Sequence, residues 1–317
     1  MRTRRLNRGP ALTEVGLGAA QFGNLYRETT DEASVAAVAM AWDRGIRYFD
    51  TAPHYGIGLS ERRLGAALAG RPRDDYVLST KVGRALVSTP ERAGELDESG
   101  FMTPASFRRE WDFSRDGVLR SVEQSLDRLR LDRLDIAYLH DPDDHWEAAS
   151  TTAVGALVEL RDQGVVRAIG AGMNQSAMLT EFVRRCDVDV VMVAGRYTLL
   201  DRSAANDLLP LALERGVGIV AAAVYNSGLL SRAEVPVDAK YDYDQAPTAL
   251  IERARGMAAV CARHGVSLPD AAVQFAMRHP AVTSVVVGMR TAEQVAGTID
   301  RSEVAIPSAL WAELDAL

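Results

Sequence analysis

The amino-acid sequence predicts a (β/α)8 TIM barrel, in which helices enclose eight parallel strands. Eight short apolar segments alternate with segments of helical periodicity, and no change of composition divides the 317 residues. Helical segments end at glycines such as Gly164 and Gly216, which can adopt the left-handed conformation that ends a helix. One barrel of about 250 residues with insertions accounts for this length. We therefore expect a single barrel domain over residues 1–317.

A doubly wound sheet is the alternative arrangement of alternating strands and helices. When such a sheet binds a dinucleotide, a G-x-G-x-x-G pattern usually opens the helix after the first strand. The sequence has no such pattern at that position. The barrel is therefore the favoured fold.

The expected elements begin with a hairpin within residues 1–14, where two extended pieces flank an R-G-P turn. This hairpin would form a plug of the barrel or lie at its edge. Residues 15–23 contain the Gly-rich end of the first strand, and Thr30 is expected to cap the helix that follows. Spacing predicts that the apolar face of this helix consists of Val35, Val38, Ala39 and Trp42.

The second strand is predicted at residues 46–50 and ends at Asp50. Tyr55 follows in a turn that contains glycine and proline, so a carboxylate and a phenol emerge together at one strand end. Ser60 is expected to cap the next helix. The six remaining strands are predicted at residues 76–82, 134–140, 166–171, 188–194, 217–223 and 282–287.

Two connections are too long for simple turns, namely residues 83–115 and residues 228–248. Long connections in compact domains usually carry function. Both follow strands, so we expect them on the carboxyl face of the barrel, where barrel enzymes keep their active sites.

Composition excludes several classes of function. The net charge of -7 and the absence of a basic stripe argue against nucleic-acid binding. No apolar run is long enough to span a membrane and no apolar leader follows the N-terminus, so we expect a cytoplasmic protein without membrane association. Two distant cysteines and five scattered histidines provide no metal-ligand spacing, so no metal is expected.

Lys81 and His140 lie at the ends of the third and fourth predicted strands, next to the strand that ends at Asp50. Adjacent strands would bring them together with Tyr55. A nearby lysine stabilises the phenolate form of a tyrosine, and an aspartate would hold that lysine in place. Such a set suits proton transfer to or from an alcohol or carbonyl oxygen, with the redox change supplied by a bound cofactor.

At these residues the sequence resembles the aldo-keto reductase family. The similarity rests on D-T-A-P-H-Y-G-I-G-L-S-E from Asp50, on T-K-V-G around Lys81 and on L-H at His140. It covers nearly the whole chain and implies an Asp, Tyr, Lys, His tetrad with a nicotinamide cofactor. Tyr55 would then be the catalytic proton donor or acceptor, Lys81 and Asp50 would tune it, and His140 would orient the substrate oxygen.

Other segments, including A-G-M-N-Q and Y-N-S-G-L-L, resemble the branch of this family that acts on L-fucose, L-galactose, D-threo-aldoses or pyridoxal. This resemblance implies an NAD(P)-dependent oxidation of C1 of an aldose lactol to a lactone. A pyridoxal 4-dehydrogenase or a general aldehyde or carbonyl reductase is the alternative. Two other hypotheses are a Schiff-base aldolase that uses Lys81 and a cofactor-binding regulatory subunit without turnover.

The resemblance also implies cofactor contacts. Asn174 would meet the nicotinamide carboxamide, Asn226, Ser227 and Gly228 the pyrophosphate, and Gly288, Arg290 and Gln294 the adenosine. Gly18, Ala19 and Asp50 complete the expected cofactor-binding set.

The expected cofactor is NAD, with NADP possible. Many NADP-using members place a Lys, a Ser and an Arg on the 2'-phosphate, and here these positions align with Gly288, Met289 and Gln294. Only Arg290 is left to meet that phosphate, so we expect Arg290→Ala to weaken NADP more than NAD.

The substrate is expected to be a small sugar or aldehyde. Residues 83–115 should supply the wall of its pocket. Trp111 and Phe113 lie in this connection, and each either lines the substrate pocket or belongs to the hydrophobic core. His54, next to Tyr55, either packs or lines the pocket. We expect a monomer or a small homo-oligomer.

Overall fold

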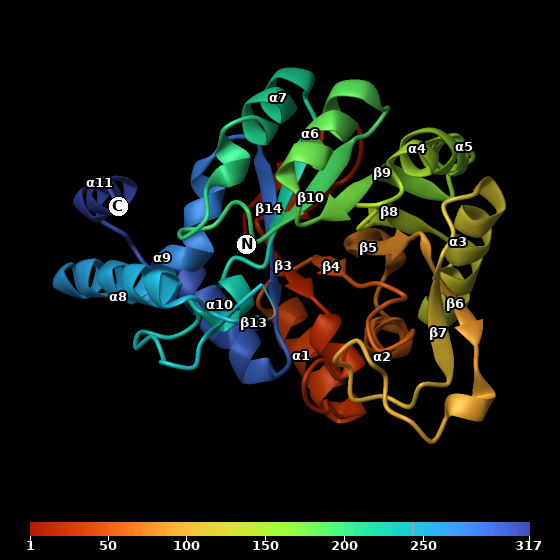
Figure 1. Ribbon diagram of the computed structural model, residues 1–317, viewed down its shortest axis with the longest axis horizontal. Coiled ribbons are helices and arrows are strands. Elements are labelled where there is room, and N and C mark those ends of the chain that lie inside the picture. Colours follow the sequence, from red (N-terminus) through yellow and green to blue (C-terminus); the bar gives the residue numbers. More distant parts are fainter. Residues whose placement is uncertain (243) are drawn as a thin grey trace.

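The computed structural model describes residues 1–242 and 244–317. Eight parallel strands pair in a closed barrel, which confirms the predicted fold (Figure 1). Each predicted barrel strand is present. They are β3 (Val15–Gly18), β4 (Tyr48–Asp50), β5 (Val77–Val82), β8 (Leu134–His140), β9 (Val166–Met173), β10 (Val190–Ala194), β11 (Gly218–Ala222) and β14 (Val282–Gly288).

The inside of the barrel is filled by side chains from alternate strand positions. Tyr48 and Tyr138 are fully buried there, and their hydroxyls lie 3.3 Å apart within hydrogen-bonding distance. The predicted N-terminal hairpin is present as β1 (Thr3–Arg5) and β2 (Ala11–Thr13). Leu6 and Leu12 of this segment join the interior cluster, so the hairpin plugs the barrel on the side away from the strand ends that carry the expected site.

Helices surround the strands and bury a second apolar layer against them (Figure 1). The surrounding helices are α1 (Asp31–Asp43), α2 (Leu59–Leu68), α3 (Arg115–Leu129), α4 (Trp146–Ala148), α5 (Val154–Asp162), α6 (Ser176–Arg185), α7 (Leu208–Arg215), α9 (Leu268–Phe275) and α10 (Ala292–Glu303). Two further helices, α8 (Thr248–Arg263) and α11 (Ser308–Asp315), pack together outside this ring.

Of two local predictions near the helix starts, the first is partly wrong and the second is wrong. Val38 of the predicted α1 face is buried and Trp42 packs against the core, as predicted. Thr30 does cap α1, accepting a hydrogen bond from the amide of Ala33, but the buried face of α1 is Ser34, Ala37, Val38 and Ala41, whereas Val35 is exposed. Small side chains let α1 pack closely against its neighbours, so they occupy the face that apolarity alone assigned to larger residues.

Ser60 does not cap α2, because the helix begins at Leu59 after Gly58 in the left-handed region. The hydroxyl of Ser60 instead donates to the carbonyl of Ala19, 2.6 Å away. It therefore links the first turn of α2 to the end of β3.

The two long connections lie at the carboxyl ends of the strands, as predicted. Residues 83–115 contain an antiparallel hairpin, β6 (Arg84–Ser88) and β7 (Phe107–Trp111). Residues 228–248 contain two short strands, β12 (Lys240–Tyr241) and β13 (Asp244–Gln245). Within the described ranges, no helix combines the length and the apolarity that crossing a bilayer requires.

Candidate active site

Three neighbouring strands bring the predicted catalytic side chains together. Asp50 ends β4, Lys81 lies near the end of β5, and His140 ends β8, and these strands pair in that order. The turn after β4 returns Tyr55 to the same place, with its ring centroid 4.8 Å from Lys81 Nζ and 5.9 Å from the ring centroid of His140.

Lys81 and Asp50 form a buried ion pair. Lys81 Nζ lies 2.7 Å from Asp50 Oδ2 and 2.9 Å from the carbonyl oxygen of Thr51, and Lys81 is only 2% exposed. Ser79 lies two residues before Lys81 on β5 and therefore on the same face of the strand. Its hydroxyl donates to Asp50 Oδ1 at 2.6 Å. The carboxylate is thus fixed from two sides, and it fixes the ammonium group beside Tyr55.

Burial and charge act in opposite directions on this pair. Burial raises the pKa of Tyr55, and Lys81 opposes this rise without reversing it. The phenol is therefore protonated at neutral pH in this structure. Burial by itself lowers the pKa of Lys81, but the Asp50 carboxylate and the Tyr55 oxygen together outweigh burial and raise it. Lys81 is therefore charged at neutral pH.

Two histidines adjoin Tyr55 in neutral form. Burial, followed by the charge of Arg84, lowers the pKa of His140 well below its usual value and lowers that of His54 to about 2. The buried His140 Nδ1 has no hydrogen-bond partner among the residues that the structure describes. The other ring nitrogen, Nε2, lies 3.7 Å from Asp141 Oδ2 at the rim of the site, and a neutral imidazole can hydrogen-bond a substrate oxygen there.

The connection 83–115 covers this cluster, as predicted, but through a residue that sequence reasoning missed. Phe101 is 3% exposed, and its ring centroid lies 5.3 Å from that of His54 and 6.2 Å from that of Tyr55. Arg109 donates to the carbonyl of His54 at 2.7 Å and forms a two-pronged ion pair with Asp97. No periodic signal in the loop sequence marks Phe101, because an isolated backbone bridge to Leu25 places it.

The two predicted aromatic wall residues differ in position. Trp111 is 47% exposed, and its ring stacks against the guanidinium of Arg84. The centroid of the Trp111 ring lies 4.5 Å from Cζ of Arg84. Phe113 is buried, stacks on Trp111 and packs so close to Gly83 that a Cβ there would overlap its ring. Phe113 therefore supports the wall from behind and belongs to the core.

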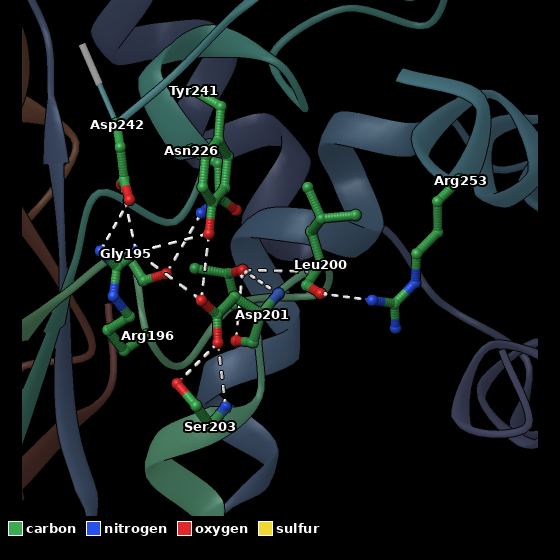
Figure 2. Close-up of polar contacts among 10 residues, drawn as sticks. Gly195, Arg196, Leu200, Asp201, Ser203, Asn226, Tyr241, Asp242 and Arg253 are labelled. Atoms are coloured by element: carbon green, nitrogen blue, oxygen red, sulfur yellow. Dashed lines mark hydrogen bonds and ion pairs between the residues drawn. The ribbon is translucent and has the colours of Figure 1, made fainter. Parts of the chain in front are cut away.

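The expected cofactor residues lie across the barrel mouth, at the ends of β11 and β14, which are paired neighbours. Asn226 is buried and its side-chain amide donates to the carbonyl of Gly195 at 3.2 Å (Figure 2). The backbone amides of Asn226 and Gly228 donate to the carbonyls of Ala223 and Tyr225. These two amides are therefore engaged within their own turn.

Figure 2 shows how the connection 228–248 is tied to the loop after β10. Arg196 forms a two-pronged ion pair with Asp242, and the hydroxyl of Tyr241 donates to Asp201 at 3.0 Å. The same loop holds Asn226 through Gly195. These contacts fix the turn after β11 in place.

Residues at the end of β3 lie between the two halves of the mouth. Gly18 pairs with Asp50 on one side and with Gly288 on the other, and the amide of Ala19 donates to the carbonyl of Asp50 at 2.8 Å. Asn174 is half-buried just after β9. Gly18 and Ala19 thus adjoin Asp50, and the cofactor contacts expected of them and of Asn174 stay predictions.

A nicotinamide dinucleotide fits the chemistry of this half. Two buried amide oxygens, Gln21 Oε1 and Asn226 Oδ1, have no partner within the described parts of the chain, so they are free to accept from amide or hydroxyl groups of a ligand. Gln21 was not predicted. Its side chain lies against Gly288, where a Cβ would overlap it.

The side chain of Arg290 is engaged within the protein. It is 8% exposed, and its guanidinium donates to the carbonyls of Arg27 at 2.8 Å and Leu25 at 2.7 Å, and to the hydroxyl of Thr29. Gln294 Oε1 accepts from the backbone amide of Arg290 at 2.7 Å. The guanidinium of Arg290 therefore holds protein backbone and is not free to bind a 2'-phosphate in this structure.

No group of three or more acidic, histidine or cysteine side chains within residues 1–242 and 244–317 is arranged to hold a metal ion.

Comparisons with known proteins agree with this geometry. Residues 14–317 match the model of the Aldo/keto reductase family. The chain is similar to a D-threo-aldose 1-dehydrogenase from Pseudomonas sp, with 48% identity over 309 residues that cover 96% of this chain and 94% of that protein. It is also similar to a pyridoxal 4-dehydrogenase from Microbacterium luteolum, with 38% identity over 326 residues and the same coverage of 96% and 94%. Among solved structures, an aldo-keto reductase from Bacillus halodurans in its holo form is similar with a TM-score of 0.77 and 26% identity, covering 100% of this chain and 96% of that one.

Proposed function

Because this chain belongs to the aldo/keto reductase family and is thus an oxidoreductase, we propose that it oxidises C1 of an aldose lactol to a lactone with NAD. The observation that supports this most is the juxtaposition of Tyr55 with the Lys81–Asp50 ion pair and neutral His140 at three neighbouring strand ends. The similar D-threo-aldose 1-dehydrogenase supports a sugar as the substrate.

In this proposal the hydroxyl on C1 gives its proton to the oxygen of Tyr55. Lys81 makes that transfer possible, since its charge offsets part of the cost of a buried phenolate. His140 donates to the ring oxygen or the reacting oxygen and orients the sugar. When bound, the nicotinamide accepts the hydride that leaves C1.

NAD is the proposed cofactor because, among the described residues that directly follow β14, no cationic side chain is free for a 2'-phosphate. Gly288 and Met289 carry no charge, and the guanidinium of Arg290 is engaged with backbone carbonyls. Asn226 and Gln21 would hold the nicotinamide half through their unpartnered oxygens.

The other hypotheses are less consistent with the site. A Schiff-base aldolase needs a neutral lysine as its nucleophile, whereas Lys81 is held as a cation in an ion pair. The similar pyridoxal 4-dehydrogenase keeps pyridoxal as a second candidate substrate. A regulatory subunit would show no turnover by itself.

A spectrophotometric screen tests the proposal. Aldoses, pyridoxal and simple aldehydes are each assayed with NAD and NADP by absorbance of the reduced cofactor, using wild type and Tyr55→Phe. We expect an aldose with NAD to give the highest kcat/KM, and we expect Tyr55→Phe to lose at least about 10² in kcat while its affinity for cofactor changes little. Near-normal activity of Tyr55→Phe, or pyridoxal as the best substrate, would contradict the proposal.

A further inference from the structure

Arg84 lies beside the proposed catalytic cluster without a role in it. Its guanidinium contacts Asp141 in an ion pair, and its Nη1 lies 3.4 Å from both ring nitrogens of His54. The ring of Trp111 covers it from the outer side, 4.5 Å away. Arg84 is thus held rigidly at the inner edge of the connection 83–115.

The hydrogen-bonding capacity of Arg84 is only partly used. A guanidinium has five N–H donors. Of these, the Nε donor is buried and has no partner anywhere in the described chain, and the contacts of Nη1 with His54 are long for hydrogen bonds. A buried donor without a partner costs free energy unless a ligand or water supplies an acceptor.

Asp141 supplies an acceptor at the same place. It directly follows His140, and its Oδ2 lies 3.7 Å from His140 Nε2. Its backbone takes a φ of 44°, in the left-handed region that side chains other than glycine rarely adopt. This conformation sits at the rim of the site, where strain is commonly tolerated for function.

The spacing matches two oxygens on adjacent carbons. A reacting oxygen bonded to His140 lies about 3 Å from Nε2, and an oxygen on the next carbon lies about 3 Å from the first, close to one hydrogen-bond length. An oxygen in that second position would lie beside the Arg84–Asp141 ion pair, whose Arg84 Nη2 and Asp141 Oδ2 atoms are in direct contact. The carboxylate would accept from its hydroxyl proton, and the guanidinium would donate to its lone pair.

We propose that Arg84 and Asp141 form a hydroxyl-binding subsite for the carbon next to the reacting carbon. The enzyme then selects aldoses and other 2-hydroxy aldehydes over substrates that lack this hydroxyl. The inference rests on the proposed function, because it takes the reacting oxygen to lie between Tyr55 and His140. It adds which part of the sugar is recognised and by which residues.

D-Arabinose and 2-deoxy-D-ribose differ only in the hydroxyl on C2, so their oxidation with NAD tests the subsite. We expect wild type to prefer D-arabinose by at least about tenfold in kcat/KM, which corresponds to one hydrogen bond to a charged group. In Arg84→Met this preference should fall to about twofold or less, through loss of activity on D-arabinose. Arg108→Met is the matched control, because Arg108 lies on β7 of the same hairpin, is exposed and pairs with Glu110.

Three results would overturn the subsite. The first is an equal kcat/KM of wild type for both sugars. The second is a loss of activity by the same factor on both sugars in Arg84→Met, and the third is an equal loss of the preference in Arg108→Met. Should Arg84→Met fail to fold, as judged by circular dichroism, Asp141→Asn replaces it, since asparagine tolerates the left-handed backbone and removes the charge. An unchanged preference in that variant also counts against the proposal.

Failure of the proposed function would look different. If wild type oxidises no aldose, reduction of glycolaldehyde and acetaldehyde, which differ only in the neighbouring hydroxyl, gives the same comparison. The subsite predicts a preference for glycolaldehyde that Arg84→Met removes. Equal loss on both aldehydes would overturn the subsite independently of the sugar reaction.

Discussion

Replacing Lys81 with methionine removes the charge that offsets the buried phenolate of Tyr55. With Lys81 Nζ 4.8 Å from the ring centroid, Coulomb's law at an effective dielectric constant of about 20 gives about 3 kcal/mol. That free energy corresponds to roughly a hundredfold less phenolate at a fixed pH. Because burial already raises the pKa of Tyr55 and Lys81 opposes this, losing Lys81 raises that pKa further.

The assay is the pH profile of kcat/KM for aldose oxidation with NAD. Oxidation requires the deprotonated phenol, so its rate rises with pH as Tyr55 loses its proton. In Lys81→Met we expect about a hundredfold lower activity near neutral pH and a rising limb displaced to higher pH. A profile with the wild-type pH dependence, at any level of activity, would refute the role given to Lys81.

A matched control separates this effect from loss of stability. Lys81→Met leaves the buried carboxylate of Asp50 without its cation, which is itself destabilising. Arg73→Met likewise removes a cation from a fully buried carboxylate at the opposite end of the barrel, that of Asp135, which keeps Arg167 as its second cation. It should lower the free energy of unfolding but leave the pH profile of the remaining activity unchanged.

Three further predictions follow from the same contacts. Arg290→Ala leaves several carbonyls unpaired and should lower the free energy of unfolding, measured in urea, by about 3 kcal/mol or more. The ratio of activity with NAD to activity with NADP should stay the same, and a selective loss of NADP activity would contradict this. The kcat/KM of wild type with NAD should equal or exceed that with NADP. A preference for NADP above about tenfold would contradict the proposal that no cationic side chain directly after β14 binds the 2'-phosphate. Burial, followed by the charge of Arg84, lowers the pKa of His54 from 6.5 to about 2, so between these pH values His54 takes up a proton only when the protein unfolds. The free energy of unfolding should therefore fall as the pH drops below 6.5, by at most about 1.4 kcal/mol per pH unit from this group. In denaturant titrations His54→Asn should show a shallower fall.

The sequence predicted the barrel because parallel strands buried on both faces are continuous apolar runs, and eight of them were visible. It also predicted the neighbourhood of Asp50, Lys81 and His140, because polar residues at the carboxyl ends of adjacent strands must converge. Both predictions depend only on local patterns and on the geometry of the barrel.

Features set by contacts between distant segments were out of reach. Phe101 is placed by a bridge to Leu25, and Arg290 is engaged by carbonyls of the segment that contains Arg27, neither of which has a signature in the local sequence. Arg84 was not predicted either. Its proposed role depends on Asp141, which follows the neighbouring strand β8 and lies 57 residues further along the chain.

The central claim, that C1 of an aldose is the carbon oxidised, is tested most directly with L-fucose deuterated at C1. The enzyme is incubated with this sugar and NAD, and the products are identified by nuclear magnetic resonance and mass spectrometry. We predict that the deuterium moves to C4 of the nicotinamide ring and that the sugar is recovered as its lactone. Reduced cofactor without deuterium, or labelled sugar oxidised at another carbon, would contradict the account.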